Sequence, residues 1–190
     1  LAKSLIEDGA KDVVVTSRDP QVPEAILRMA AVRDCSLSAI ACDTSDVVSM
    51  CAFGEWMREW KPNTHSVYFA AGQLALSSLS SMTYESFWSL VKTKCVGAYA
   101  LRSLFPYSHV GFFSSVSSTW GQSGASHYAA SNSFLDALSA LGCEQGLSST
   151  SVNFGPFSSV GMASSEAESV SRMGLCLLSP EEVNDGFRAS

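Results

Sequence analysis

Charged side chains are scarce in this 190-residue sequence, and those present carry a net negative charge. Asp, Glu, Lys and Arg make up 16% of the residues, and the formal net charge is −6 at pH 7. A protein that binds DNA or RNA needs clustered Lys and Arg to neutralise phosphates, so no nucleic-acid partner is expected. Hydrophobic residues make up 46%, which is too many for a disordered acidic chain. We therefore expect a folded domain.

The sequence also lacks a hydrophobic run long enough to cross a membrane, because polar residues interrupt every apolar stretch before it reaches the ~18 residues of a membrane helix. No basic segment followed by a long apolar one opens the chain, so no secretory signal is expected. These absences favour a cytoplasmic protein with no membrane partner.

Residues that could hold a metal ion or form disulfides are few and poorly spaced for either purpose. The six cysteines contain no C-x-x-C pair, and the three histidines, His65, His109 and His127, lie far apart. No metal site is therefore expected. The cysteines are interpreted as reduced thiols in a reducing compartment.

What the sequence does contain is an alternation of apolar strand patterns with helix patterns. Strands are predicted at residues 12–17, 36–42, 65–71, 109–114 and 150–154. Helices are predicted at residues 1–9, 20–29, 45–60, 84–104 and 127–141, and a last helix begins at Ser179 and Pro180. The strands are apolar enough to be buried on both faces. The alternation predicts an α/β fold, a Rossmann-like doubly wound parallel sheet with helices on both faces.

The stretch with the most chemical information is residues 111–136. A predicted strand ends in Ser114 and Ser115, a Gly-containing loop follows, and Tyr128 opens a helix that also carries Asn132. The spacing of four residues places Tyr128 and Asn132 on one face of that helix. Ser115 lies at the carboxyl end of a parallel strand, the edge at which doubly wound sheets bind their ligands.

With these residues the chain resembles the short-chain dehydrogenase/reductase superfamily, and most closely the ketoreductase domain of polyketide synthases and animal-type fatty acid synthases. The similar motifs are T-S-R at residues 16–18, A-C-D at 41–43, F-A-A-G at 69–72, K-C-V-G-A at 94–98, F-S-S-V at 113–116, Y-A-A-S-N at 128–132, G-P-F at 155–157, G-M-A at 161–163 and L-S-P-E-E at 178–182. The resemblance covers nearly the whole chain.

The resemblance implies four catalytic residues. Ordinary short-chain dehydrogenases carry a lysine one turn after the tyrosine, but here Asn132 stands at that position and the lysine is Lys94, on the preceding helix. The synthase ketoreductases are similar in this exchange. Hydride transfer from a cofactor to a ketone then requires Tyr128 to protonate the carbonyl oxygen and Ser115 to polarise it. Lys94 would stabilise the tyrosine anion, and Asn132 would hold Lys94 or a relaying water.

The resemblance also implies NADPH as the cofactor. Arg18 follows a strand, where NADP enzymes place an arginine for the 2′-phosphate, although an ordinary surface role would also explain it. Asp43 resembles the residue that contacts the adenine amine, but it could instead cap the next helix. The small residues before Gln73 allow the backbone to approach the ribose. The expected cofactor-binding residues are Ser17, Arg18, Cys42, Asp43, Ala70, Ala71, Gly72, Lys94, Tyr128, Gly155, Pro156 and Phe157.

The substrate implied by the resemblance is a β-ketoacyl thioester carried on the phosphopantetheine of an acyl carrier protein domain. Neighbouring synthase domains are the other implied partners. Trp120, eight residues before Tyr128, resembles the A-type members, and the L-D-D motif of B-type members is absent from residues 73–76. A-type stereochemistry is therefore expected. Trp120 and Met162 are expected to contact the substrate, with loop packing as the alternative explanation for each.

The glycine-rich phosphate loop of the family has no counterpart in the sequence. Because no G-x-G-x-x-G occurs near its start, residues 1–190 are expected to form a single ketoreductase-like domain that is truncated at the N-terminus and the C-terminus and belongs to a larger multidomain synthase. One alternative is a catalytically silent pseudo-ketoreductase that acts as a scaffold. Another is a serine hydrolase, but its G-x-S-x-G motif fails at Ala125.

Overall fold

The computed structural model describes residues 1–73, 77–158, 174 and 176–188. The chain forms two compact units, Leu1–Asp43 and Thr44–Ser190, each with its own parallel strands and its own helices. Met162, one of the two expected substrate-binding residues, lies outside the described residues. No helix among the described residues has both the length and the apolar character needed to span a membrane.

The first unit is a small α/β layer. It consists of α1 (Ala2–Glu7), β1 (Asp12–Ser17), α2 (Glu24–Val32) and β2 (Ser36–Ala41). The two strands pair in parallel, with Asp12 opposite Ser36 and Ser17 opposite Ala41. Gly9 ends the first helix at a φ of 94°, a conformation that only glycine adopts without strain. The buried core is formed by Ile6, Val13, Ala30 and Cys35.

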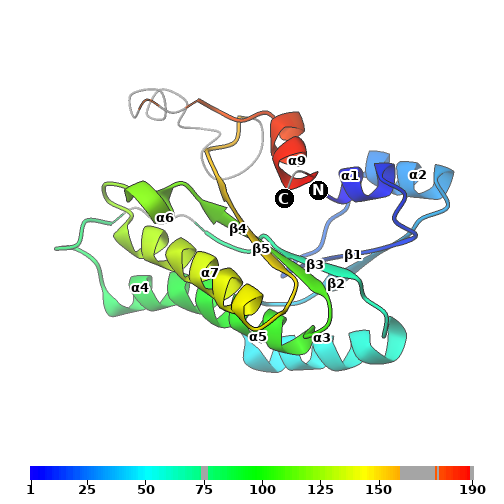
Figure 1. Cartoon of the computed structure of the whole chain (residues 1–190), viewed down its shortest axis with the longest axis horizontal. Coiled ribbons are helices and arrows are strands. Elements are labelled where there is room, and N and C mark those ends of the chain that lie inside the picture. Colours follow the sequence, from blue (N-terminus) through cyan, green and yellow to red (C-terminus); the bar gives the residue numbers. More distant parts are fainter. Residues whose placement is uncertain (74–76, 159–173, 175, 189–190) are drawn as a thin grey trace. The chain divides into compact units, whose positions relative to one another are not determined.

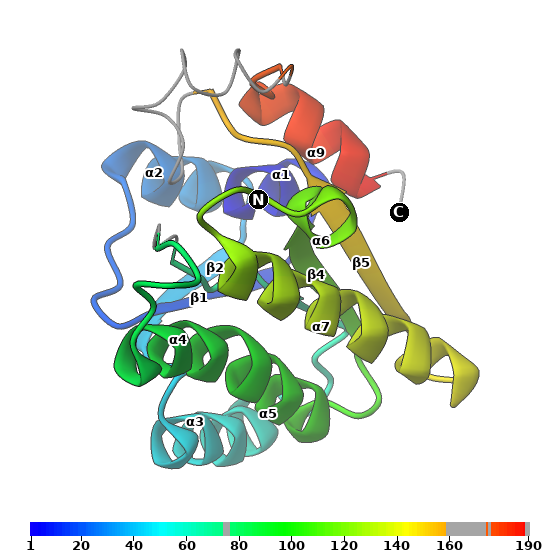
Figure 2. The same ribbon diagram turned by 90° about the vertical axis from the view of Figure 1, so that its left-hand side faces the viewer.

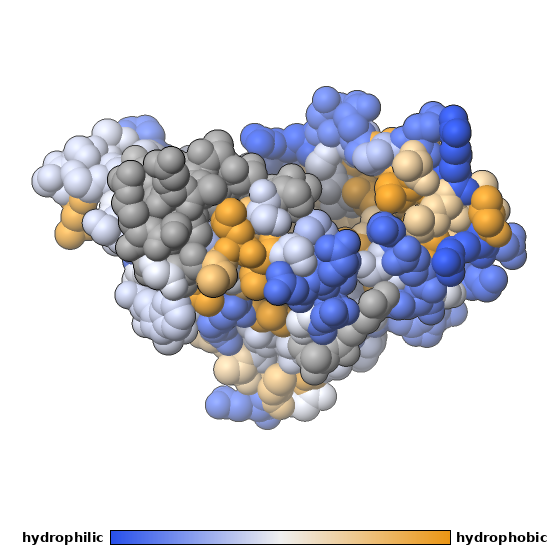
Figure 3. Space-filling model, turned by 90° about the horizontal axis from the view of Figure 1, so that it is seen from above, coloured by the Kyte–Doolittle hydropathy of each residue, from blue (hydrophilic) through white to orange (hydrophobic). Residues whose placement is uncertain are grey.

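Helix α2 begins later than the sequence pattern predicts. The expected helix over residues 20–29 is wrong at its start, because Pro23 forms the N-cap and the helix begins at Glu24. A residue that precedes proline is sterically pushed out of the helical region, so the chain before Pro23 stays extended. The helix exposes Leu27 and Val32. Such apolar side chains lie among hydrophilic ones on the surface that Figure 3 shows.

The second unit contains a parallel three-stranded sheet in the order β3-β4-β5. Its elements are α3 (Val47–Trp60), β3 (Ser66–Phe69), α4 (Tyr84–Val91), a π-helical turn η1 (Lys92–Val96), α5 (Gly97–Leu104), β4 (His109–Ser115), α6 (Ser117–Trp120), α7 (Ser126–Glu144), β5 (Ser149–Phe154) and α9 (Pro180–Arg188). Helices α4, α5 and α7 cover one face of the sheet, and α9 lies on the other side of β5 (Figures 1 and 2). The α/β class and the parallel strands predicted from the sequence are confirmed.

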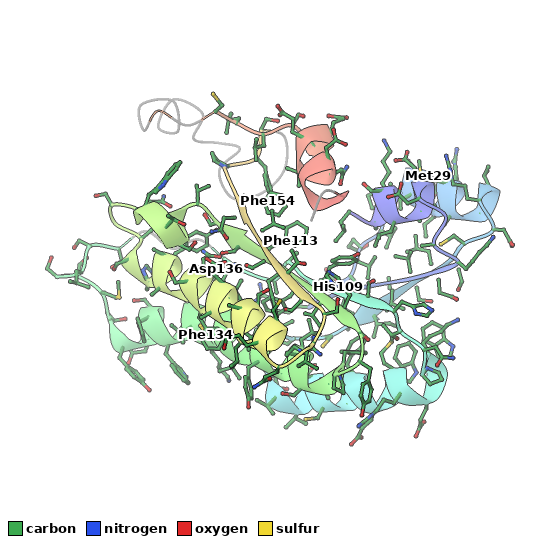
Figure 4. All side chains as sticks on the ribbon, viewed as in Figure 1. Met29, His109, Phe113, Phe134, Asp136 and Phe154 are labelled. Atoms are coloured by element: carbon green, nitrogen blue, oxygen red, sulfur yellow. The ribbon has the colours of Figure 1, made fainter. Side chains whose placement is uncertain are left out.

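Strand β4 is the centre of this unit. Val110 and Phe112 are fully buried on it, and the ring of Phe112 lies edge-on to Phe69 of β3 at 6.4 Å between centroids. On the other face of the sheet, Phe113 stacks on Phe154 of β5 at 5.0 Å (Figure 4). Apolar side chains on both faces of a strand are typical of a central strand in a parallel sheet.

Two helix starts depend on side-chain caps. Asp46 begins α3, and its carboxylate accepts hydrogen bonds from the backbone N–H groups of Val48 and Ser49. The alternative that Asp43 caps this helix is therefore wrong. At α9, the Ser179 hydroxyl accepts from the Glu182 N–H, and the Glu182 carboxylate accepts from the Ser179 N–H. This reciprocal pair is a capping box, in agreement with the helix start predicted there.

The predicted helix over residues 84–104 contains a π-helical turn that the sequence does not reveal. The helical path is continuous from α4 to α5, but Lys92–Val96 adopts π geometry. Such turns insert one residue into a helix and are frequent at functional sites. Gly97 follows the turn, and a Cβ there would lie 2.7 Å from the Thr44 carbonyl oxygen. The glycine therefore permits close packing of α5 against the chain that precedes α3.

Arg102 is a buried cation that ties the end of α5 to the amino ends of two strands. Its side chain is 7% exposed. Its guanidinium donates to the carbonyl oxygens of Pro106 at 2.5 Å, Ser108 at 3.4 Å and Ser148 at 3.2 Å. A planar guanidinium with several donors suits such a cluster of carbonyls. Arg102 therefore joins the end of α5 to the segments that lead into β4 and β5.

We expect Arg102→Met to lower the free energy of unfolding by about 2–3 kcal/mol, because one buried and two partly buried hydrogen bonds to carbonyl oxygens are lost. Urea unfolding followed by circular dichroism measures this change. Arg58→Met on the exposed face of α3 serves as the control, with an expected effect within about 0.5 kcal/mol. Equal effects of the two substitutions would contradict the role given to Arg102.

Candidate active site

Three elements of the second unit meet at the carboxyl end of β4: the strand itself, the π turn η1 and helix α7. Lys94 on η1 is only 4% exposed although it is a lysine. Its Nζ donates to Asn132 Oδ1 at 2.7 Å and to the Phe113 carbonyl oxygen at 3.1 Å. A buried ammonium needs such partners, because an unpaired charge in the protein interior is costly. The structure thus joins the lysine of one helix to the asparagine of another.

Asn132 is fully buried and both polar atoms of its amide are used. Its Oδ1 accepts from Lys94, and its Nδ2 donates to the Tyr128 carbonyl oxygen at 2.9 Å. An ammonium can only donate, so the lysine fixes the orientation of the amide. Ser114 also donates from Oγ to the Asn132 carbonyl oxygen at 3.2 Å. The Ser114–Ser115 doublet was visible in the sequence, but this contact of Ser114 was not anticipated.

Tyr128 lies one helical turn before Asn132 on α7 and is half-buried. The Lys94 ammonium lies 5.6 Å from the centroid of the Tyr128 ring. This is within the range of cation–π attraction. The geometry brings Lys94, Tyr128 and Asn132 together.

The charge of Lys94 is set by opposing effects. Burial lowers the pKa of its ammonium from 10.5 to about 8, while the nearby Cys95 thiol and the Asp136 carboxylate act to raise it. With a pKa of about 8, most Lys94 side chains carry a proton at pH 7. The ammonium therefore remains cationic near neutrality and loses its charge as the pH rises through 8.

Ser115 is the last residue of β4. Its Oγ accepts a hydrogen bond from the Ser117 N–H at 3.2 Å, at the start of α6. A hydroxyl that accepts this bond still has its own proton to donate to a ligand. At the other end of α6, Trp120 is 71% exposed. The predicted contact of Trp120 with the substrate stays a prediction.

The small residues after β3 include one, Gly72, that lies next to the Lys94 side chain. Ala70 and Gly72 are exposed and Ala71 is half-buried. A Cβ on Gly72 would lie 2.8 Å from Lys94 Cε and 3.6 Å from its Nζ. The sequence predicts a cofactor role for Gly72. The structure shows in addition that the missing side chain leaves room for Lys94.

Gly72→Ala is therefore expected to displace the Lys94 ammonium and to lower kcat about tenfold for the ketone reduction that the family resemblance implies, because rate falls steeply when a reacting group is misplaced. Steady-state kinetics measures the effect. Gly146→Ala provides a control for a glycine substitution away from the site, with a Cβ in open space but a φ of 76°, so the two variants are compared at equal folded fraction. An unchanged kcat in the Gly72 variant would contradict this role of the glycine.

Four of the expected cofactor residues lie at one end of the other unit. Ser17 and Arg18 are exposed where β1 ends, and the buried Cys42 donates its backbone N–H to the Ser17 carbonyl oxygen at 2.9 Å. Asp43 follows and is half-buried. Arg18 forms no salt bridge within the described part of the chain. Its guanidinium is therefore available to an anion.

The segment after β5 pairs with a later part of the chain. Phe157 forms a parallel bridge with Leu178, in which the Leu178 N–H donates to the Pro156 carbonyl oxygen at 2.8 Å. The Phe157 ring lies edge-on to Phe154 at 5.8 Å. Gly155 is in ordinary contact with Leu178. The predicted cofactor role of this segment stays a prediction.

Each unit, taken by itself, presents a donor that suits one part of a nicotinamide cofactor. An ammonium has three N–H donors, and the two partners of Lys94 use two of them. Among the described residues no partner takes the third, which leaves it for a ribose hydroxyl or for the oxygen of Tyr128. In the first unit, the exposed Arg18 suits a phosphate group.

Comparison with known proteins agrees with this geometry. Residues 1–159 match the sequence model of the family described as KR domain. The hybrid PKS-NRPS synthetase fsa1 of Fusarium sp. (strain FN080326) is 32% identical over 156 residues, which cover 80% of this chain and 4% of that protein. The chain therefore spans only a small part of the length of such a synthetase.

Solved structures give the same result. The ketoreductase PlmKR1, from the first module of phoslactomycin biosynthesis in Streptomyces sp. HK803, matches with a TM-score of 0.90 and 26% identity, covering 98% of this chain and 45% of that one. A structure described as A-type ketoreductases from a modular polyketide synthase matches with a TM-score of 0.88 and 26% identity, covering 98% and 41%. The shared fold is Rossmann-like. This chain belongs to the KR domain family, and the solved structures that it matches are ketoreductases of polyketide biosynthesis.

Proposed function

We propose that this chain reduces a β-ketoacyl thioester, carried on an acyl carrier protein domain, to the β-hydroxyacyl thioester with NADPH. The observation that carries the proposal is the buried Lys94 ammonium, bonded to Asn132 and 5.6 Å from the ring of Tyr128. A phenol beside a fixed cation at the carboxyl end of a parallel strand is suited to donate a proton to a carbonyl oxygen. The chain's membership of the KR family supports a ketone as the reacting group.

The chemistry follows from these side chains. NADPH, when bound, supplies the hydride, which no side chain can provide. As negative charge develops on the carbonyl oxygen, the Tyr128 hydroxyl donates its proton to that oxygen. Lys94 stabilises the tyrosine anion that remains. The Ser115 hydroxyl donates a hydrogen bond to the same carbonyl oxygen and so stabilises the developing charge.

Asn132 acts by holding Lys94. Its Oδ1 accepts from the ammonium, and its Nδ2 is bonded to the backbone of the turn that carries Tyr128. One amide thus fixes the lysine relative to the tyrosine. Such fixed positioning supplies much of the rate in reactions that need aligned groups.

For the cofactor, we propose that Arg18 binds the 2′-phosphate of NADPH and that Asp43 contacts the adenine. The exposed and unbridged guanidinium of Arg18 after a parallel strand supports this assignment. We assign Ser17, Cys42 and the segments 70–72 and 155–157 to the surrounding cofactor contacts, as the family resemblance implies.

For the substrate, we propose A-type stereochemistry and delivery by an acyl carrier protein within a multidomain synthase. The exposed Trp120 at the end of α6 and the match to A-type ketoreductases support the stereochemistry. The hybrid PKS-NRPS relatives, of which this chain covers a few per cent, support neighbouring synthase domains.

The test measures NADPH binding and NADPH oxidation by the full-length protein with a simple β-ketothioester, with NADH in parallel. Turnover with a preference for NADPH is the expected result, and chiral analysis of the hydroxy product then checks the A-type assignment. If the protein shows no NADPH binding and no turnover, the proposal is overturned and a pseudo-ketoreductase scaffold is favoured. A preference for NADH would overturn the role of Arg18 alone.

A further inference from the structure

The carboxylate of Asp136 is fixed by two side chains of β5. Its Oδ1 accepts from Ser151 Oγ at 2.6 Å, and its Oδ2 accepts from Asn153 Nδ2 at 3.3 Å. Figure 4 labels Asp136 on α7, the helix that carries Tyr128 and Asn132. The side chain is half-buried, so its charge is only partly screened by solvent.

Asp136 lies on the same face of α7 as Asn132, one helical turn further along, because the two positions are four residues apart. The register of the sheet relates its two partners on β5 to the β4 residue that Lys94 contacts. Ser151 of β5 pairs with Phe112 of β4, and Asn153 pairs with Ser114. The Asp136 carboxylate, which bonds to both β5 residues, therefore lies level with the β4 residue between these pairs, Phe113. The Phe113 carbonyl oxygen accepts from Lys94. The strands β4 and β5 are adjacent, and adjacent strands are about 4.8 Å apart.

Few other charges face the ammonium. The elements packed against η1 are α4, α5 and α7, whose charged residues are Glu85, Arg102, Asp136 and Glu144. Glu85 is exposed in the first turn of α4, and Arg102 is bonded to carbonyl oxygens at the amino ends of β4 and β5. Within η1, Cys95 is half-buried and Lys92 carries a like charge. Of the acidic residues on these elements, Asp136 is therefore the one whose carboxylate the structure shows held by side chains of a neighbouring strand.

We infer that Asp136 is a positioning residue for the proposed reduction: held to β5 by Ser151 and Asn153, its carboxylate keeps the buried Lys94 ammonium in the charged form. The inference rests on the proposed function. The Cys95 thiol and this carboxylate both oppose the effect of burial on the pKa of Lys94, and of the two only the carboxylate is held by another strand. A neutral Lys94 would not stabilise the tyrosine anion, so activity at mildly alkaline pH depends on Asp136.

The test is the pH dependence of kcat/KM for Asp136→Asn in the full-length protein. The amide keeps an oxygen that accepts from Ser151 but removes the charge. Loss of the charge lowers the pKa of Lys94, so the alkaline limb of the profile is expected to move to lower pH by about half a unit. Activity at pH 6, where Lys94 is protonated in both proteins, is expected to be unchanged. A purely structural role would lower activity by the same factor at every pH.

Two control variants separate the charge from its surroundings. Ser151→Ala removes a hydrogen bond from the carboxylate but keeps its charge, so a smaller shift of the alkaline limb is expected. Glu144→Gln removes an equal charge from the exposed end of the same helix, and its profile is expected to match the parent. An unshifted limb in Asp136→Asn, or an equal shift in Glu144→Gln, would overturn the inference.

A second measurement needs neither turnover nor the Asp136 variant. The ¹³C resonance of the Asp136 carboxylate, followed by NMR as the pH is raised, is expected to show a step near pH 8 as Lys94 loses its proton. The step is expected to vanish in Lys94→Met. No step in the parent protein would overturn the coupling. This readout does not depend on catalysis. A protein without ketoreductase activity would contradict the proposed function, but the coupling between the Asp136 carboxylate and the Lys94 ammonium could still be tested.

Discussion

Tyr128→Phe is expected to lower kcat by about 10²- to 10⁴-fold, the range that a general acid contributes. The substitution removes one hydroxyl and keeps the ring beside the Lys94 ammonium, where the two are 5.6 Å apart. The amide of Asn132 bonds to the backbone of Tyr128 and not to its side chain, so the surrounding contacts persist. The loss therefore reports the proton donor and not a change of fold. NADPH oxidation under saturating substrate measures it.

The control is Tyr99→Phe on α5, where the tyrosine is 62% exposed. Its kcat is expected to equal that of the parent. NADPH affinity is expected to stay within about twofold in Tyr128→Phe, because one ring hydroxyl contributes little to the binding of a large ligand. A Tyr128→Phe protein that binds NADPH and retains full turnover would show that another group protonates the substrate.

Lys94→Met is expected to lower kcat by about 10²- to 10³-fold, comparable to the loss of an oxyanion donor in other enzymes. Methionine fills a similar volume but carries no charge and no N–H. The tyrosine anion would lose its cation, Asn132 Oδ1 would lose the donor that Lys94 supplies, and the Phe113 carbonyl oxygen would lose one hydrogen bond. The buried acceptor of Asn132 without this donor also costs about 1–3 kcal/mol in stability. Kinetics is therefore measured on protein shown to be folded by circular dichroism.

The matched control is Lys92→Met, two residues earlier in the same π turn. Lys92 was the neighbouring lysine in the sequence, and its loss is expected to leave kcat within about twofold. The parent protein offers a check without mutation: because burial lowers the pKa of Lys94 to about 8, the ammonium is present below that pH and activity falls as the pH rises through it. Equal losses in the two variants would contradict the assignment to Lys94.

Local patterns predicted most of the secondary structure. The strand at residues 12–17 was predicted with the bounds that β1 has, because three consecutive β-branched residues flanked by polar ones suit only an extended buried segment. The Ser179 capping box also follows from adjacent residues. Signals of this kind depend on neighbours in the chain and need no knowledge of the tertiary contacts.

The start of α2 was predicted wrongly and helix α6 was not predicted, because these features depend on competing local signals or on distant partners. Pro20 resembled a helix start, but Pro23 keeps the chain before it extended and delays α2. The short helix α6 lies in what the sequence shows only as a loop, and its position is supported by the Ser133 hydroxyl, which donates to the Ser118 carbonyl oxygen at 3.0 Å. Neither feature has a periodic pattern that a short window could detect.

The sequence by itself determined the α/β class and the helix face that Tyr128 and Asn132 share. These follow from periodicity and from a spacing of four residues, which fixes the direction of side chains on a helix. Resemblance to a known family gave the pairing of a lysine on one helix with an asparagine on the next. Composition and spacing alone could not give it.

Only the tertiary structure decided how Lys94 is held. The π turn, the absent side chain of Gly72 and the hydrogen bond to Asn132, 38 residues away, together place one ammonium. Tertiary contacts likewise hold the Asp136 carboxylate, which accepts from Ser151 and Asn153 of β5. A charge becomes stable in the interior only when distant segments bring partners to it, and no local pattern in the sequence encodes that encounter.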